Sequence, residues 1–112
     1  PLACAAAHAA CRVLDRPEIR ERVRDEGEHL LAGLRALVDD GLAREARGRG
    51  LMCAIDLPAP RAAEVVAGLL ERGYLANNTS STTVRFLPPL VIGRADLDGL
   101  LAALRAELDR ND

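Results

Sequence analysis

The spacing of apolar residues changes repeatedly along this chain, between the repeat of a helix and the alternation of a strand. Residues 97–108 carry leucine at steps of three and four, which is the repeat of a helix with one buried face. One central stretch instead alternates apolar with other residues, as a strand does when one of its faces is buried: Leu51, Cys53, Ile55 and Leu57. A chain that carries both patterns has to pack helices against a sheet.

Glycine and proline mark where these elements begin and end. Pro17 suits the first turn of a helix, while Gly41 and Gly73 are placed to end one. The predicted elements, in chain order, are helices over 2–14 and 17–40, a strand over 51–57, a helix over 61–72, strands over 74–76 and 83–87, and a last helix through 97–108. The expected fold class is therefore α/β (α+β), with a small, mostly antiparallel sheet covered by helices.

Finer expectations concern the connections and one helix. Residues 48–50, with the sequence Gly-Arg-Gly, predict a break before the first strand, and the polar run 77–82 has the composition of a turn. The helix over 61–72 is expected to bury its apolar side chains, which are Val65, Val66, Leu69 and Leu70.

Length and charge limit the classes of function. A chain of 112 residues has room for a single domain, spanning residues 1–112. Its 15 basic and 17 acidic residues give a formal charge of -2, so we expect no nucleic-acid partner. No apolar run approaches the ~20 residues of a membrane span, so we expect no membrane partner. The start at Pro1, without methionine, suggests a piece of a longer protein.

All the basic residues are arginine, and the chain contains no lysine. Arginine stays protonated, because its pKa lies above about 12, and it does not attack a carbonyl group. Covalent chemistry that depends on a lysine amine must therefore be supplied by other polypeptide.

The thiols and imidazoles do not indicate a catalytic or metal centre. Cys4 and Cys11 would lie about 10 Å apart along a helix, too far for a disulfide, which favours reduced thiols and a cytoplasmic location. Cys53 is expected to face the core as an unreactive thiol. His8 and His29 have no metal-ligating residue at the spacing of a zinc site.

Two arginine-containing stretches remain as candidate binding residues. The segment 47–50, Arg-Gly-Arg-Gly, fits either a phosphate or RNA contact or a turn, and the turn is favoured because no helix follows it. Arg85 lies within a predicted strand before a Pro-Pro corner, where its guanidinium is suited to bidentate capture of a carboxylate. The alternative, which the residues alone favour, is an exposed strand residue paired with a helix carboxylate.

Three segments carry a resemblance when they are taken together. They are Pro1-Leu2-Ala3-Cys4-Ala5-Ala6-Ala7, Arg47-Gly48-Arg49-Gly50-Leu51-Met52 and Val84-Arg85-Phe86-Leu87-Pro88-Pro89-Leu90-Val91-Ile92. In this order and at these separations they resemble the C-terminal part of class III pyridoxal-phosphate-dependent aminotransferases. The likeness covers essentially the whole chain, and the acetylornithine aminotransferase branch is the most similar.

The resemblance implies that residues 1–112 are the C-terminal small domain of a fold type I transferase. The missing N-terminal large domain would carry the lysine that binds pyridoxal 5'-phosphate, and the helix over 1–16 would pack on it. Arg85 matches the family arginine before the Pro-Pro pair and would bind the α-carboxylate of the amino-acid and 2-oxo-acid substrates. The parent enzyme would be a cytoplasmic homodimer.

The resemblance also implies a reaction, in which an amino group passes from N-acetylornithine to 2-oxoglutarate in arginine biosynthesis. The cofactor supplies the electron sink, and this chain, inactive alone, would orient the substrate. Ornithine, succinylornithine and 4-aminobutyrate aminotransferases are alternatives within the class. A stand-alone domain that binds or regulates through a small ligand is the alternative outside it.

Two departures from the family pattern have local consequences. Gly93 stands where relatives carry Ser or Thr before the last helix, so Asp96 is left to favour the helix dipole. The run 77–82 is rich in Ser and Thr where relatives carry Gly or Asp, which leaves the fine substrate preference open.

Overall fold

The computed structural model describes residues 1–110, and over this range it contains four helices and one four-stranded sheet. The elements are α1 (Leu2–Leu14), α2 (Pro17–Asp39), β1 (Glu45–Arg49), β2 (Met52–Asp56), α3 (Ala62–Glu71), β3 (Asn77–Asn78), β4 (Thr83–Phe86) and α4 (Arg94–Asp109). The strand order is β1-β2-β4-β3, and each neighbouring pair is antiparallel. The expected fold class is confirmed.

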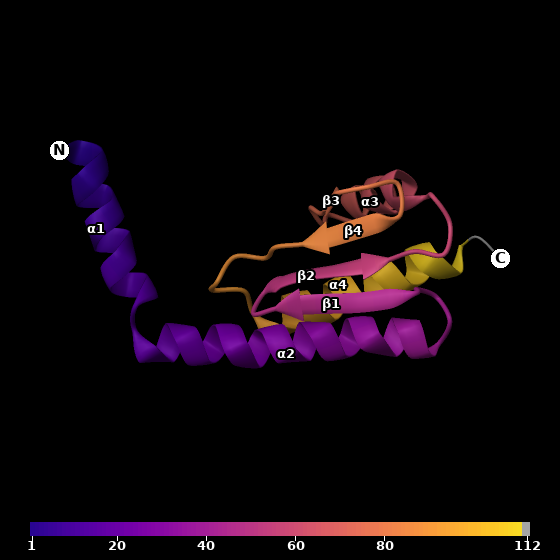
Figure 1. Cartoon of the computed structure of the whole chain (residues 1–112), viewed down its shortest axis with the longest axis horizontal. Coiled ribbons are helices and arrows are strands. Elements are labelled where there is room, and N and C mark those ends of the chain that lie inside the picture. Colours follow the sequence, from indigo (N-terminus) through magenta and orange to yellow (C-terminus); the bar gives the residue numbers. More distant parts are fainter. Residues whose placement is uncertain (111–112) are drawn as a thin grey trace.

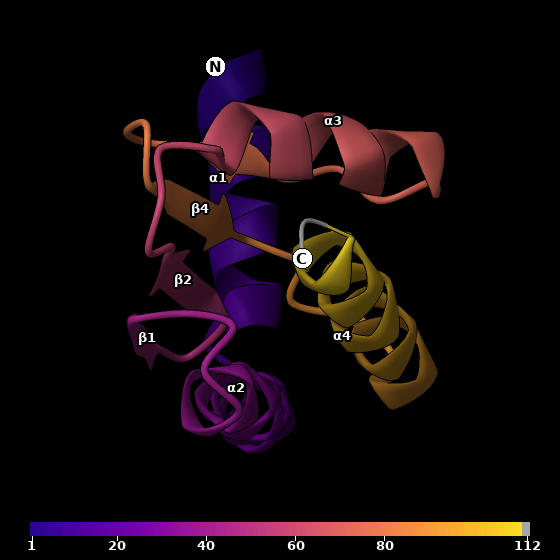
Figure 2. The same ribbon diagram turned by 90° about the vertical axis from the view of Figure 1, so that its right-hand side faces the viewer.

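The helices α2, α3 and α4 lie on one side of the sheet and leave its other face open (Figure 2). The core fills the space between the two layers, and its largest members are Phe86, Leu30, Leu34, Leu37, Ile55, Leu57, Leu69, Leu97 and Leu104. The alternation predicted for the central strand is confirmed, because its four apolar residues are each at most 2% exposed. One sheet face is thus buried and the other is available for binding.

The predicted helix boundaries are largely confirmed. α2 begins at Pro17 and ends just before Gly41, whose φ of +79° lies in the left-handed region that glycine tolerates. α4 follows Gly93, which provides no side-chain cap, and carries Asp96 in its first turn. These features agree with the sequence.

The break predicted at 48–50 is confirmed at Gly50, which lies in a turn, but it is wrong for Gly48 and Arg49, which belong to β1. Charged residues and glycine have low strand propensity, and pairing with β2 overrides it. The two strands form a hairpin, closed by Arg49 opposite Met52, with a turn at Gly50. The φ of Gly50 is +57°, as the first residue of a type II′ hairpin turn requires.

The strand predicted at 74–76 is also wrong, since β3 is formed by Asn77–Asn78 within the expected turn. Gly73 and Tyr74, which follow α3, instead cap the C-terminus of that helix with their backbone N–H groups. The N–H of Tyr74 donates to the carbonyl of Leu69 (2.9 Å), and the N–H of Gly73 donates to Leu70 (2.9 Å). This Schellman arrangement occupies the backbone of Tyr74, so the sheet begins only later.

Helix α3 buries fewer residues than expected. Val65 and Leu69 are buried and Val66 is partly buried, but Leu70 is 57% exposed. Leu70 lies about 100° around the helix from Leu69 and so falls outside the buried stripe. The prediction that Leu70 belongs to the core is wrong.

Helix α1 stands apart from the rest of the molecule (Figure 1). It meets α2 at a marked angle near Asp15, as predicted, and each of its residues is exposed. Within residues 1–110 no helix has both the length and the apolar character needed to cross a membrane.

Candidate functional site

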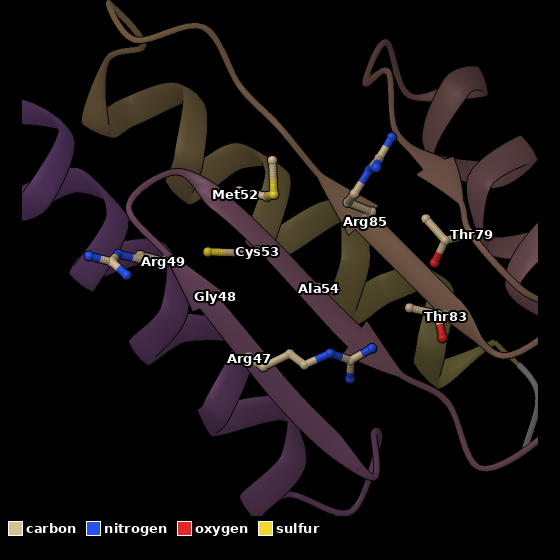
Figure 3. A pocket seen from close by; sticks show the side chains of 9 residues that line it. All are labelled: Arg47, Gly48, Arg49, Met52, Cys53, Ala54, Thr79, Thr83 and Arg85. Carbon is tan, nitrogen blue, oxygen red and sulfur yellow. The ribbon is translucent and has the colours of Figure 1, made fainter.

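The open face of the sheet carries a cavity of about 600 Å³ (Figure 3). Strands β1, β2 and β4 and the turn after β3 contribute its walls, and the lining residues are Arg47, Gly48, Arg49, Met52, Cys53, Ala54, Thr79, Thr83 and Arg85. The cavity is therefore built mainly on strands, which hold side chains more rigidly than a loop does.

Strand register places two arginines on either side of a small residue. Ala54 of β2 lies opposite Arg47 of β1 and opposite Arg85 of β4, and Asn77 of β3 follows Arg85 in the same row. Residues opposite one another in antiparallel strands project to the same face. The methyl group of Ala54 thus leaves space between the two long side chains.

Arg47 is held by Asp56 of β2. Arg47 Nη1 donates to Asp56 Oδ2 (2.6 Å), and Nη2 donates to Oδ1 (3.3 Å), which makes a bidentate pair. Thr83 Oγ1 donates to the same carboxylate (2.6 Å). These donors, Arg47 first and Thr83 second, hold the pKa of Asp56 below its usual value.

The turn before β4 is fixed by a second set of hydrogen bonds. Ser80 Oγ accepts the backbone N–H of Thr82 (3.2 Å) and of Thr83 (3.0 Å), and it donates to Thr83 Oγ1 (2.9 Å). The polar run therefore does act as a turn in its second half, and it orients Thr83 towards Asp56.

Arg85 has no carboxylate partner among the described residues. Its Nε donates to Asn77 Oδ1 (3.3 Å), and no ion pair to it is found within residues 1–110. The helix carboxylate of the alternative interpretation is thus absent from that range. Arg49, the third arginine of the cavity, extends away from Arg85 in Figure 3. Arg85 is thus a strand guanidinium of the cavity that can bind a carboxylate ligand.

The cysteines and histidines considered from the sequence do not form a reactive site, although Cys53 lines the cavity. Cys53 is 1% exposed, and burial raises the pKa of its thiol. Cys4 and Cys11 are free and exposed on α1. His8 is exposed, and His29 Nε2 lies 2.5 Å from Asp98 Oδ1 on α4. Within residues 1–110 no cluster of His, Cys, Asp and Glu is suited to hold a metal ion.

Sequence reasoning identified Arg85 but missed the residues around it. Asp56 and Ala54 lie on the outward face of the predicted strand, where alternation alone could have placed them beside Arg85. Asn77 was assigned to a turn, so its position beside Arg85 could not be anticipated.

The cavity does not provide an anchor for pyridoxal phosphate. Covalent attachment of this cofactor needs a lysine amine, and the lining residues, like the whole chain, include no lysine. The residues present therefore fit a carboxylate at Arg85 and do not fit the covalent attachment of the cofactor.

Comparison with known proteins gives a consistent result. The family model described as aminotransferase class-III matches residues 1–108. An acetylornithine aminotransferase of Gloeobacter violaceus is 42% identical in an alignment of 112 positions that covers 98% of this chain and 28% of that protein. An ornithine aminotransferase of Bordetella pertussis is 42% identical in an alignment of 106 positions that covers 93% of this chain and 25% of that protein.

A solved structure shares the fold closely. The N-acetylornithine aminotransferase from Stenotrophomonas maltophilia superposes with a TM-score of 0.88 at 31% identity, covering 97% of this chain and 31% of that one. The chain spans about a quarter of the length of the curated relatives it matches. With a family model matched over nearly its whole length, this chain belongs to the class III aminotransferases.

Proposed function

We propose that this chain is the C-terminal, substrate-orienting domain of a longer acetylornithine aminotransferase. The enzyme would transfer an amino group from N-acetylornithine to 2-oxoglutarate, as a cytoplasmic homodimer in arginine biosynthesis. The relatives named acetylornithine aminotransferase support the choice of donor. Pyridoxal 5'-phosphate would supply the electron sink, attached to a lysine outside this chain.

The proposal rests on the environment of the Arg85 side chain. It stands on a paired strand, lines a cavity of about 600 Å³ and has no ion-pair partner within residues 1–110. Among the described residues only its Nε is engaged, so its Nη groups remain to donate two parallel hydrogen bonds to a carboxylate. Such a contact fixes the orientation of a bound amino acid, which is how this chain would contribute to the rate.

A second domain would cover surfaces that this chain leaves exposed. Helix α1 is exposed throughout, and Leu75, Leu87 and Val91 are exposed apolar side chains near the Pro88–Pro89 corner. Apolar surface of this kind marks contact sites. We assign α1 to contact with the large domain.

The proposal is tested by substitution of Arg85 in the full-length enzyme. Arg85→Ala removes a charge-assisted contact worth about 1.5–3 kcal/mol, so kcat/KM should fall at least tenfold and up to several hundredfold. Both the donor and the acceptor half-reactions should be affected, because each substrate presents a carboxylate to the same site. Arg85→Lys should restore part of the rate, since an ammonium keeps the charge but not the planar fork.

The matched control is Arg35→Ala, which removes an exposed arginine of α2 outside the cavity and should leave both half-reactions unchanged. Single-turnover kinetics of each half-reaction and thermal unfolding should be measured on the same preparations. Normal kinetics of Arg85→Ala in both halves would contradict the assignment.

A further inference from the structure

Asn77 makes the one hydrogen bond to the Arg85 side chain that is found within residues 1–110. Asn77 Oδ1 accepts the Nε–H of Arg85 at 3.3 Å. The two residues lie opposite one another in the antiparallel pair of β3 and β4. On the other side of β4, the residue opposite Arg85 is Ala54, whose methyl group accepts no hydrogen bond. Asn77 is therefore the cross-strand neighbour that can orient this guanidinium.

The position of Asn77 is fixed although β3 has only two residues. Just after β3, the N–H of Thr79 donates to the carbonyl of Thr83 (3.1 Å), which ties the chain to β4. Arg85 lines the cavity, whereas Asn77 lies beside it. Asn77 is thus placed to influence a bound ligand through Arg85.

A guanidinium presents two pairs of parallel N–H groups to a carboxylate. One pair lies at its end and comes from Nη1 and Nη2, and the other lies along its side and comes from Nε and one Nη. The bond to Asn77 occupies the side pair of Arg85. The end pair has no hydrogen-bond partner among residues 1–110, and the side chain of Arg85 extends away from Arg47 (Figure 3).

The amide of Asn77 orients Arg85 without cancelling its charge. A carboxylate at the same position would form an ion pair with the guanidinium and would compete with a carboxylate ligand. No such ion pair to Arg85 is found within residues 1–110. Arg85 therefore has a fixed orientation and keeps its full charge for the ligand.

We propose that Asn77 is a positioning residue for Arg85: by accepting the Nε–H, it closes the side of the guanidinium and leaves the end pair of N–H groups to receive the substrate carboxylate. The proposal rests on the proposed function, since it takes Arg85 as the carboxylate anchor. A single mode of binding at Arg85 gives the bound substrate a single orientation, which the reaction requires.

Asn77→Ala removes the acceptor and keeps the charge of Arg85. The side pair of N–H groups is then free to bind the substrate in a second, unproductive orientation. In single-turnover kinetics of the 2-oxoglutarate half-reaction of the full-length enzyme, the limiting rate should fall about threefold to tenfold. The dissociation constant of glutarate, an unreactive dicarboxylic acid, should change by less than about twofold in calorimetry, because the charge that attracts it is unchanged.

Asn77→Asp should have the opposite effect on rate and binding. The aspartate keeps an acceptor for Nε, so the limiting rate should stay within about twofold of the parent. Its charge offsets that of Arg85, so glutarate should bind about fivefold more weakly. Because Asp and Asn have the same shape, this variant also serves if Asn77→Ala does not fold, and glutarate binding equal to that of the parent would then overturn the proposal.

The matched control is Asn78→Ala, which changes the same residue type at the next position of β3. Asn78 lies opposite Val84, and its Nδ2 donates to the carbonyl of Ser80 (3.3 Å). This variant should leave the limiting rate and the binding of glutarate within about twofold. A merely structural role of Asn77 would alter rate and binding together in both of its variants. That result, or an unchanged limiting rate in Asn77→Ala, overturns the proposal.

Arg85→Ala in the same measurements separates this proposal from the proposed function. If Arg85→Ala weakens glutarate at least tenfold while the limiting rate does not respond to Asn77→Ala, only the role of Asn77 is refuted. If Arg85→Ala leaves both the binding of glutarate and the limiting rate unchanged, Arg85 is not the anchor, and both proposals fail.

Discussion

At the residue scale, Glu107 is the most unusual ionisable group of the core. This residue is 5% exposed, and its carboxylate accepts hydrogen bonds from Arg72 (2.6 Å) and from Arg110 (3.2 Å to each oxygen). The bond from Arg72 is the main reason that the pKa of Glu107 lies below its usual value. Gly68 makes the arrangement possible, because a Cβ there would overlap the carboxylate.

A lowered pKa makes the contribution of Glu107 depend on pH. The stabilisation is complete above the unfolded-state pKa of about 4.5 and is lost as pH falls through the lower folded-state value. Glu107→Gln should therefore lower the free energy of unfolding by about 1–3 kcal/mol at pH 7, and this difference should shrink below about pH 4.5. Urea unfolding of the isolated chain over this pH range measures it.

The control for this series is Glu64→Gln, an exposed glutamate of α3, which should change the free energy of unfolding by less than about 0.5 kcal/mol. The opposing result is a difference in free energy of unfolding between Glu107→Gln and the parent that stays constant down to the lowest pH at which both chains fold. That result would show that the carboxylate charge of Glu107 is not what stabilises the fold.

Thiol reactivity should separate the cysteines at the same scale. Cys53 is buried with a raised pKa, whereas Cys4 and Cys11 are exposed, and only the thiolate reacts. Titration of the isolated chain with an aromatic disulfide reagent should give two fast equivalents and one that appears only on unfolding. Fast reaction of Cys53 in the folded chain, identified by mass spectrometry, is the result that would oppose this.

At the element scale, what could be predicted depended on how each element is stabilised. Helices α2, α3 and α4 and strands β2 and β4 bury their own apolar faces, so their patterns are visible in the sequence. Strand β1 has no such pattern and exists through its hairpin partner, while β3 is short and positioned by the end of α3. The candidate site follows the same rule: Arg85 could be found from its strand, but its setting depends on register, which a single strand pattern does not provide.

The contact between α2 and the β1–β2 turn depends on Gly27. A Cβ at this position would overlap the backbone carbonyl of Gly50, so the helix or the turn would have to move. Gly27→Ala should destabilise the chain by about 1–3 kcal/mol despite the gain in helix propensity. In the matched variant Gly33→Ala, the new methyl group meets only the flexible end of the Leu101 side chain.

Chemical denaturation of both variants tests this contact. Gly33→Ala should unfold close to the parent, since Leu101 can turn aside and the helix gains propensity. Equal stability of the two variants would mean that the backbones of Gly27 and Gly50 are not in close contact in solution.

At the scale of the whole molecule, helix α1 determines the elongated shape, although none of its residues belongs to the core. The principal extents are 53 × 26 × 21 Å, and α1 extends away from the layered body (Figure 1). Deletion of residues 1–16 should therefore change the midpoint of thermal unfolding of the isolated chain by less than about 3 °C. A large loss of stability would mean that α1 packs on this body in solution.

The exposed helix should also control association. At high concentration the isolated chain should form oligomers, because the alanine-rich face of α1 permits close approach of a second helix. Sedimentation should show that the chain without residues 1–16 remains monomeric. The same sedimentation behaviour with and without α1 would place the association elsewhere or exclude it.

The two edge strands of the sheet explain why a helix, and not a strand, should mediate such association. An edge strand has unpaired N–H and C=O groups along its outer side, which can pair with another chain and start amyloid-like growth. Charged side chains on the edge strand, or a very short edge strand, prevent this pairing. The outermost strand on one side, β1, carries the exposed charges of Glu45, Arg47 and Arg49, and β3 on the other side is only two residues long. Neither edge strand of this fold is therefore suited to pair with another chain, and the sheet can expose its open face to water without polymerising.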